Sequence, residues 1–417
     1  MVEPSPAGQH TLRRHNSALV LRAVAGEPGV SRAAIAAGTG LAKATVSSLV
    51  DRLIAADLVA ETGPVARTGR GRPSTGLTLS TTGPHGLGVE IGVDYLATCL
   101  VDLTGRLHAH RMRPGDNRAR SAPQVLSRVI RVLRAALREA ETLGVPVGGI
   151  GVAVPGLVEA STGRLRLAPN LGWRDVDLGS HLSTALADRL PPTGVVVGNE
   201  ADFAAEAELW QSGPAGPGGQ RDFVHVSGEI GIGAGFVVGG VPFPGVRGFS
   251  GEIGHIPVDP NGPVCGCGAR GCLDRLAGLE WIMRDAGVWD GRPGVARPPA
   301  EVLDVLVERL TEGDTRSRWA VRAAGRWLGI ALAAAINVLD IPTVVLGGSY
   351  AALEPWLRDP LCAELDTRVL SSACGPVTVV RSALGREAAV RGAAASVVRA
   401  IIADPDAFVV AGADPAG

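Results

Sequence analysis

The chain has 417 residues, of which 46% are hydrophobic and 19% charged, and its formal net charge is −1. This composition is typical of a globular protein with two or three domains, and it excludes an intrinsically disordered chain. No apolar run is long enough to predict a membrane span, and nothing at the N-terminus resembles a signal peptide. We therefore expect a cytoplasmic protein with no membrane partner, whose cysteines are in a reducing environment.

The net charge is small, but the charges are unevenly distributed: the N-terminal segment, here called the head, is basic, and the rest of the chain, the body, is acidic. Residues 1–82 contain nine Lys or Arg and five Asp or Glu, whereas the rest of the chain contains 31 and 36. A basic segment at one end favours contact with nucleic acid there.

The first eighty residues predict three helices followed by a hairpin. A first helix precedes Ser31, which is placed to cap a short second helix, and Gly38-Thr39-Gly40 predicts a tight turn. The third helix should cover 45–54, because its apolar residues recur on one helical face. Two short strands are expected at 58–61 and 77–80.

This order of elements is typical of a winged helix-turn-helix, in which one helix enters the major groove and the wing reaches the DNA backbone or the minor groove. The alternative is a three-helix adaptor with a solvated basic loop. The arginines and the lack of acids in the loop between the two strands favour double-stranded operator DNA as partner. The expected DNA contacts are Lys43, Thr45, Ser47, Ser48, Arg67, Arg70 and Arg72.

After a predicted linker at 81–86, two stretches resemble one another. Residues 87–102 and 223–238 each read as strand, glycine-containing turn and strand, and each is followed by long helices and further strands. A duplication of this kind predicts two α/β lobes with a ligand cleft between them. The predicted domains are the head at 1–82, a first lobe at 86–210, and a second lobe at 211–417 that includes the C-terminal helix.

One imidazole and three thiols are concentrated in the second lobe. His255, Cys265, Cys267 and Cys272 lie within eighteen residues, and this is the ligand set of a closed tetrahedral zinc site. The loop can bend back on itself because of its glycines at 266, 268 and 271. A disulfide or a metal-free loop is the alternative, but clustered thiols in a reducing compartment are more often metal ligands.

Several segments together resemble the ROK family of repressors and sugar kinases. They are the winged helix, Glu90-Ile91-Gly92 and residues 154–158, 169–173, 199–202, 251–274 and 345–349. The resemblance implies an α/β fold with an actin-like, duplicated ribonuclease-H-type body, a sugar bound between the lobes, and a homodimer or homotetramer. It implies sugar contacts at Gly156, Asn170, Asn199, Glu200, Glu252, His255 and Asp274.

Some of these residues have a simpler interpretation. Glu252 and Asp274 could instead support the metal loop, and Asn170 could be an ordinary turn residue. His255 would serve both purposes, with one ring nitrogen on zinc and the ring edge at the sugar.

The phosphate-binding turns depart from those of the family's kinases. The kinases carry D-x-G-G-T at the first turn, where this chain has Val93 and Asp94, and the second turn introduces Glu229. Two like charges 4 Å apart repel by about 1 kcal/mol in water and by about 4 kcal/mol at an effective dielectric of 20. Glu200 replaces the aspartate that is the kinases' catalytic base. We therefore expect no catalytic residues and no enzyme activity.

Three functions compete. A sugar-responsive transcriptional regulator, a repressor, accounts for the basic head, the sugar residues and the altered phosphate turns together. An ATP-dependent sugar kinase leaves the head and Asp94 unexplained. The third function is a DNA-binding regulator with a vestigial effector domain. In that case Glu200 and Asp274 would be substitutions in a site that no longer binds a ligand.

Overall fold

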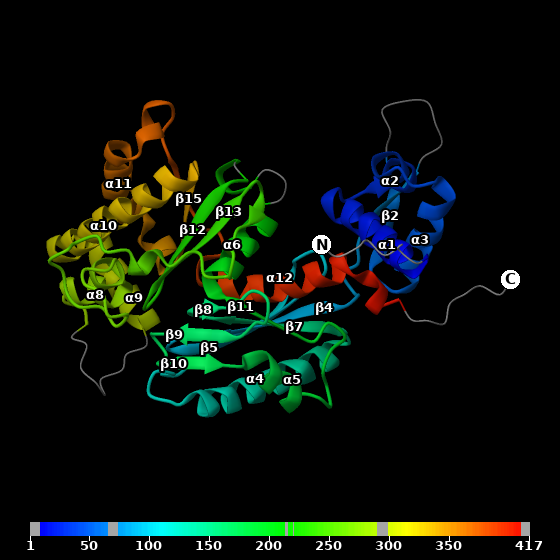
Figure 1. Ribbon diagram of the computed structural model, residues 1–417, viewed down its shortest axis with the longest axis horizontal. Helices are drawn as coiled ribbons and strands as arrows, with labels where there is room; N and C mark the ends of the chain where they lie inside the picture. Colours follow the sequence, from blue (N-terminus) through cyan, green and yellow to red (C-terminus); the bar gives the residue numbers. More distant parts are fainter. Residues whose placement is uncertain (1–8, 66–73, 213–215, 220, 290–298, 410–417) are drawn as a thin grey trace, which may run out of the picture.

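The computed structural model describes residues 9–65, 74–212, 216–219, 221–289 and 299–409. A small N-terminal head is followed by a body of two lobes, each built on its own sheet (Figure 1). The α/β class, the winged helix-turn-helix and the duplicated body predicted from the sequence are confirmed.

The head has the predicted order of elements. These are α1 (Gln9–Gly26), β1 (Val30–Ser31), α2 (Arg32–Thr39), α3 (Lys43–Ala55), β2 (Val59–Val65) and β3 (Ser74–Leu79). The Ser31 hydroxyl accepts a hydrogen bond from the Ala34 amide at 3.2 Å, so Ser31 caps α2 as predicted. The strand β1 was not predicted, and it pairs with β3 to complete a sheet in the order β1-β3-β2. The wing arginines Arg67, Arg70 and Arg72 lie outside the described residues.

Two five-stranded sheets of the same topology form the body. Their strand orders are β11-β7-β4-β5-β6 and β14-β13-β12-β15-β16. In each sheet the central strand pairs antiparallel with the next strand in sequence and parallel with the one that follows a long helix. The first sheet contains β4 (His85–Ile91), β5 (Tyr95–Val101), β6 (Leu107–Pro114), β7 (Val147–Val154) and β11 (Val195–Asn199). The second contains β12 (Phe223–Gly228), β13 (Ile232–Val238), β14 (Val241–Pro242), β15 (Thr343–Gly348) and β16 (Thr378–Arg381).

Helices cover both sheets, and a small third sheet lies beside the first. The helices are α4 (Ala122–Leu143), α5 (Leu178–Ala185), α6 (Glu200–Gln211), α7 (Asp274–Ala277), α8 (Leu279–Asp285), α9 (Pro299–Glu312), α10 (Thr315–Leu339), α11 (Ser349–Arg368) and α12 (Ala388–Ala403). The third sheet consists of β8 (Leu157–Val158), β9 (Leu165–Ala168) and β10 (Trp173–Val176). The turn between β9 and β10 carries one of the expected sugar contacts, Asn170, to the cleft.

The helices α6 and α12 pack against each other between the two sheets, and each contacts the sheet of the other lobe. Helix α6 packs against β12 and β13, whereas α12 packs against β4, β5 and β7 (Figure 1). The sequence prediction assigned the C-terminal helix to the second lobe, and the packing places it on the sheet of the first. The apolar side of α12 explains this position, because Val390, Ala394 and Val397 pack in the core that contains Tyr95 and Cys99 of β5.

Helix α10 is long and apolar enough to cross a bilayer by length and composition, which the sequence analysis did not anticipate. More than half of its apolar window is buried, and it packs against α11 and α8. It therefore occupies the position of a core helix in the second lobe.

The segment that joins the head to the body is held in place by contacts with the head. The Ser80 and Thr82 hydroxyls donate to the Asp57 carboxylate at 2.6 and 3.0 Å, and a Cβ added at Gly83 would lie 1.9 Å from the Asp57 carbonyl oxygen. Helix α1 also packs against α12, and Arg14 Nε donates to Asp404 Oδ1 at 2.6 Å. A single hydrophobic core continues from the head into the α12 side of the first lobe.

A substitution at Gly392 tests the packing of α12 on α6. A Cβ at this position would lie 1.8 Å from the carbonyl oxygen of Phe203, a distance that requires the helices to separate. Gly392→Ala gains about 1 kcal/mol of helix propensity, but overpacking costs about 1–3 kcal/mol or more, so we expect a net loss of stability. Urea denaturation measures it, with Gly38→Ala in α2 as control, because nothing lies within 4 Å of a Cβ there. Equal or higher stability of Gly392→Ala would contradict this packing.

Candidate functional site

The predicted recognition helix presents a small polar surface. In α3, Val46, Leu49, Val50 and Leu53 are buried in the core of the head. On the opposite side Lys43, Thr45 and Ser48 are exposed, and Ser47 is half-buried. These short side chains allow an approaching surface close to the helix backbone, as groove binding requires.

The four expected metal ligands converge. The ligand atoms of His255, Cys265, Cys267 and Cys272 all lie within 4.8 Å of one another. Cys267 Sγ and Cys272 Sγ are 3.7 Å apart, and Cys265 Sγ is 3.8 Å from His255 Nδ1. Ligand atoms about 2.3 Å from a common ion at tetrahedral angles are separated by about 3.7 Å, so the cluster fits a tetrahedral metal ion.

The alternative of a disulfide is not supported by this geometry. All six cysteines of the chain are within the described residues, and all are free. The loop bends back as predicted, with Gly268 and Gly271 at φ of 96° and 66°.

The second nitrogen of His255 faces away from the thiols. His255 Nε2 is 3.9 Å from Glu252 Oε2, while Asp274 Oδ1 accepts the amide hydrogen of Ile232 at 2.8 Å. Asp274 thereby ties the start of α7 to the start of β13. These contacts agree with the interpretation of Glu252 and Asp274 as supports of the metal loop.

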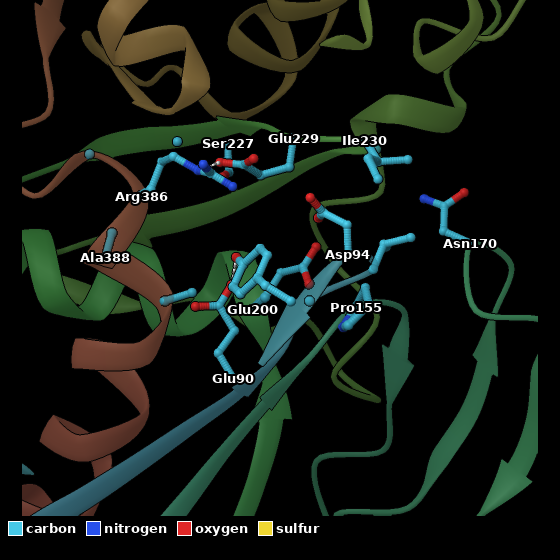
Figure 2. Close-up of a pocket in the computed structure, with 17 residues that line it drawn as sticks. Glu90, Asp94, Pro155, Asn170, Glu200, Ser227, Glu229, Ile230, Arg386 and Ala388 are labelled. Carbon is cyan, nitrogen blue, oxygen red and sulfur yellow. Dashed lines mark hydrogen bonds and ion pairs between the residues drawn. The ribbon is translucent and has the colours of Figure 1, made fainter. Parts of the chain in front are cut away.

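A cavity lies where the two glycine turns meet between the lobes. The turn from β4 to β5 contributes Asp94, the turn from β12 to β13 contributes Glu229, and α6 begins at Glu200 beside them (Figure 2). The predicted cleft between duplicated lobes is thus present. Its lining also includes Glu90, Gly92, Val93, Tyr95, Pro155, Asn170, Ser227, Ile230, Gly231, Gly348, Gly385, Arg386, Ala388 and Ala389.

One arginine faces the acids of this cavity. Arg386 Nε is 3.5 Å from Glu229 Oε1, and the guanidinium lies 5.5 Å from the centre of the Tyr95 ring. The Tyr95 hydroxyl donates to Glu90 Oε1, and the Ser349 hydroxyl donates to Glu229 Oε2 at 3.2 Å. The Arg386 charge is therefore shared among several carboxylates rather than free for a phosphate.

Burial raises the pKa of every acid in the cavity. It raises the pKa of Glu90 to about 8, against the hydrogen bond from Tyr95, and it raises the pKa of Asp94 and of Glu229 despite the nearby Arg386. Burial, together with the charges of Glu90 and Glu229, raises the pKa of Glu200 well above its usual range. The cavity therefore disfavours further negative charge.

The raised pKa of Glu90 predicts a pH-dependent stability. The folded chain holds this proton up to about pH 8, whereas an unfolded glutamate loses it near 4.5. Between these values the free energy of unfolding should fall with rising pH by as much as about 1.4 kcal/mol per pH unit, and Glu90→Gln should abolish this contribution. Urea denaturation at about pH 5 and pH 8 measures the difference between variant and wild type. A difference that does not change with pH would refute the raised pKa.

The structure brings together only part of the expected sugar set. Asn170 and Glu200 line the cavity, and the other five residues lie outside its lining. The Asn199 side chain caps α6 by accepting from the Ala201 amide at 2.7 Å, and it donates to the Gly156 carbonyl at 2.9 Å. Asn199 therefore positions Glu200 and fixes the loop at Gly156.

Sequence reasoning missed Arg386. The duplication could have indicated Arg386, because the two lobes have equivalent elements: α12 follows β16 in the same way that α6 follows β11. Since α6 brings Glu200 to the cavity, the residues that precede α12 were candidates for the opposite wall.

Comparison with known proteins agrees with this architecture. Residues 86–400 match the ROK family, and residues 12–71 match the MarR family. The chain belongs to the ROK family. The xylose repressor of Bacillus subtilis is 28% identical, over 94% of this chain and 97% of its own length. The DNA-binding transcriptional dual regulator NagC of Escherichia coli is also 28% identical, over 95% and 97%.

Solved structures of the family include both regulators and kinases. A ROK family transcriptional regulator described as a homolog of the E. coli MLC protein has a TM-score of 0.76 at 25% identity and covers 95% of this chain and 99% of its own. The ROK family glucokinase from Streptomyces griseus, in complex with glucose and AMPPNP, has a TM-score of 0.63 at 26% identity and covers 75% and 98%. The regulators therefore match almost the whole chain, and the kinase matches three quarters of it.

Proposed function

We propose that this protein is a cytoplasmic, sugar-responsive transcriptional repressor with a body that does not phosphorylate its ligand. The observation that carries the proposal is the similarity to the xylose repressor of Bacillus subtilis and to the transcriptional dual regulator NagC, which extends over the head and the body together. The acids that line the cavity support it, because a site rich in buried acids disfavours the negative charge of ATP phosphates.

The head binds operator DNA through α3 and the wing. The exposed polar residues of α3 meet base edges, and the wing arginines Arg67, Arg70 and Arg72 contact phosphates or the minor groove. A homodimer or homotetramer would present paired heads to two half-sites.

The effector is a sugar that binds in the cleft between the lobes. Asn170 and Glu200 contact its hydroxyl groups directly, and Glu252 and His255 border it from the second lobe. Asn199, Asp274 and the backbone at Gly156 hold these groups in place, because their hydrogen bonds are made within the protein.

The Cys/His cluster holds one zinc ion in a structural role, because His255, Cys265, Cys267 and Cys272 would fill all four positions. With Nδ1 on the metal, Nε2 of His255 would face Glu252, whose Oε2 is 3.9 Å away. The metal would thus order the loop that borders the sugar.

Helix α12 transmits the conformational effect of sugar binding to the head. Closure of the lobes moves α6 and α12 against each other, and α12 packs on α1 through the shared core. A change in the position of α1 alters the spacing of paired recognition helices, so the sugar-bound form binds DNA less tightly.

A sugar kinase is the competing function, and the similarity to a glucokinase favours it. Thermal-shift assays with D-glucose, D-xylose and N-acetyl-D-glucosamine, followed by coupled ATPase assays with each, separate the two. We expect at least one sugar to raise the melting temperature and none to support turnover. ATP-dependent turnover of about 1 s⁻¹ or more would restore the kinase, and no binding by any sugar would favour a vestigial body.

A further inference from the structure

An ion pair joins the two lobes beside the cavity. Arg118 lies in the loop between β6 and α4 of the first lobe, and Glu280 lies in the first turn of α8 in the second. Arg118 Nη1 donates to Glu280 Oε1 at 2.7 Å, although the two residues are 162 positions apart in the chain. The two side chains are 39% and 26% exposed, so water and salt screen the pair incompletely. Neither residue belongs to the lining of the cavity.

In the first lobe, the residue next to Arg118 holds the glycine turn in place. Asn117 is fully buried, and its Nδ2 donates to the carbonyl oxygens of Gly92 at 2.7 Å and Tyr95 at 3.0 Å. The Asn117 amide also donates to the Val93 carbonyl at 2.9 Å. Separation of the loop from the turn would leave these buried groups without partners, so the two keep a fixed relation.

In the second lobe, the residue next to Glu280 is tied to the other glycine turn. The Leu279 amide donates to the Glu229 carbonyl at 3.2 Å, so α8 begins directly against this turn. Asp94 and Glu229 line the cavity from the two turns (Figure 2). The ion pair therefore links the two turns through one neighbouring residue in each lobe.

Other contacts around the cavity require the same spacing of the lobes. The Ala160 amide of the first lobe donates to the Arg247 carbonyl of the second at 3.0 Å. Asn170 Nδ2 lies 2.5 Å from the position that a Cβ would take on Gly231. The structure thus has the lobes in contact around the cavity. A hydrogen bond of 2.7 Å is lost once its partners separate by about 1 Å, so the ion pair forms only near this spacing.

We propose that Arg118 and Glu280 form a latch that holds the lobes closed and sets the balance between sugar binding and DNA binding. They are positioning residues, because they act through the two glycine turns. The latch rests on the proposed function, in which sugar binds the closed form and DNA binds the open form more tightly. A variant without the latch should therefore bind sugar less tightly, bind DNA more tightly, or show part of each effect.

The two effects have a fixed product. The fold loss of sugar affinity multiplied by the fold gain of DNA affinity equals the factor by which the ratio of closed to open form falls, whatever that ratio is in the wild type. A partly exposed ion pair is worth about a factor of five at most, and charge reversal adds a repulsion of similar size. We expect a product of about ten for Arg118→Glu and for Glu280→Arg. The double variant exchanges the charges and forms the pair again, so its product should be near one.

Two titrations of the full-length protein measure the product. Calorimetry gives the sugar affinity, with whichever of D-glucose, D-xylose and N-acetyl-D-glucosamine raises the melting temperature. Fluorescence anisotropy gives the DNA affinity, with a duplex that the protein selects from a random library. Arg189→Glu is the matched control, because Arg189 is 38% exposed and its partner Glu141 lies in the same lobe. The control makes the same change of charge, and its product should stay near one.

Each result supports or overturns the latch. A product near one for Arg118→Glu, with sugar still bound, would overturn it and leave the sugar-responsive repressor standing. Failure of the charge exchange to restore the wild-type affinities would also overturn it, since a folding defect would give that result. If no sugar binds, the proposed function fails, and the DNA affinity alone decides. An unchanged DNA affinity in Arg118→Glu would then overturn the latch as well, whereas a gain that the exchange reverses would support it.

Discussion

Cys267→Ser is expected to weaken zinc binding by more than about 100-fold, because changes to groups that merely support metal ligands already cost 10–100-fold. Cys267 is exposed, so serine fits without loss of packing and the effect reports on the metal alone. At zinc concentrations that saturate the wild type, a 100-fold loss lowers the free energy of unfolding by up to about 2.7 kcal/mol. Metal analysis by mass spectrometry and urea denaturation measure the two effects.

Cys374→Ser is the control for this substitution. Cys374 is also exposed and free, but it lies outside the cluster, so zinc content and stability should stay at wild-type values. Wild-type protein that contains no stoichiometric zinc when prepared without chelator would overturn the assignment. So would a Cys267→Ser variant that retains its zinc.

Thr45→Glu is expected to reduce DNA affinity by at least about 100-fold. The position is exposed on the polar side of α3, and a carboxylate there would face the phosphates of the groove. At an effective dielectric of 20, one such contact at 4 Å costs about 4 kcal/mol, which corresponds to more than a factor of 100. The head should still fold, because an acid in the first turn of a helix is favourable.

The measurement is fluorescence anisotropy with a duplex that the full-length protein selects from a random library. Thr142→Glu supplies the matched control, since it adds the same charge at an exposed site near the end of α4, in the body. If Thr45→Glu bound this duplex as tightly as the control does, α3 would not be the recognition helix.

The elements and their pairing could be predicted from the sequence where the signal is local or repeated. The head was predictable from the periodicity of α3 and the cap at Ser31. The duplicated sheets were predictable from the similar strand pairs at 87–102 and 223–238. The convergence of the Cys/His cluster was also predictable, because all its ligands come from one short loop.

Long-range packing was not predictable in the same way. The apolar side of α12 fits either sheet, and only the fold decides that it crosses to the first lobe. The same crossing brings Arg386 to the cavity from a position far in sequence from Glu229. The joint core of head and body was missed because the break in pattern at 81–86 resembles a free linker.

Some of the expected sugar contacts have a different role in the structure than the sequence predicted, for a related reason. Side chains such as Asn199 and Asp274 have the polarity of ligand contacts, but in the structure their oxygens accept backbone hydrogen bonds. Sequence shows which groups are present, and the hydrogen-bond partners decide which of them remain free.

The effect of a bound sugar on DNA affinity tests the proposed sugar response most directly. The full-length protein is bound to its selected duplex, and the anisotropy is followed during titration with each sugar that raises the melting temperature. We predict that at least one of them weakens DNA binding by about tenfold or more, which requires about 1.4 kcal/mol of preference for the closed form. If every sugar that binds the protein leaves the DNA affinity unchanged, the protein is not a sugar-responsive repressor.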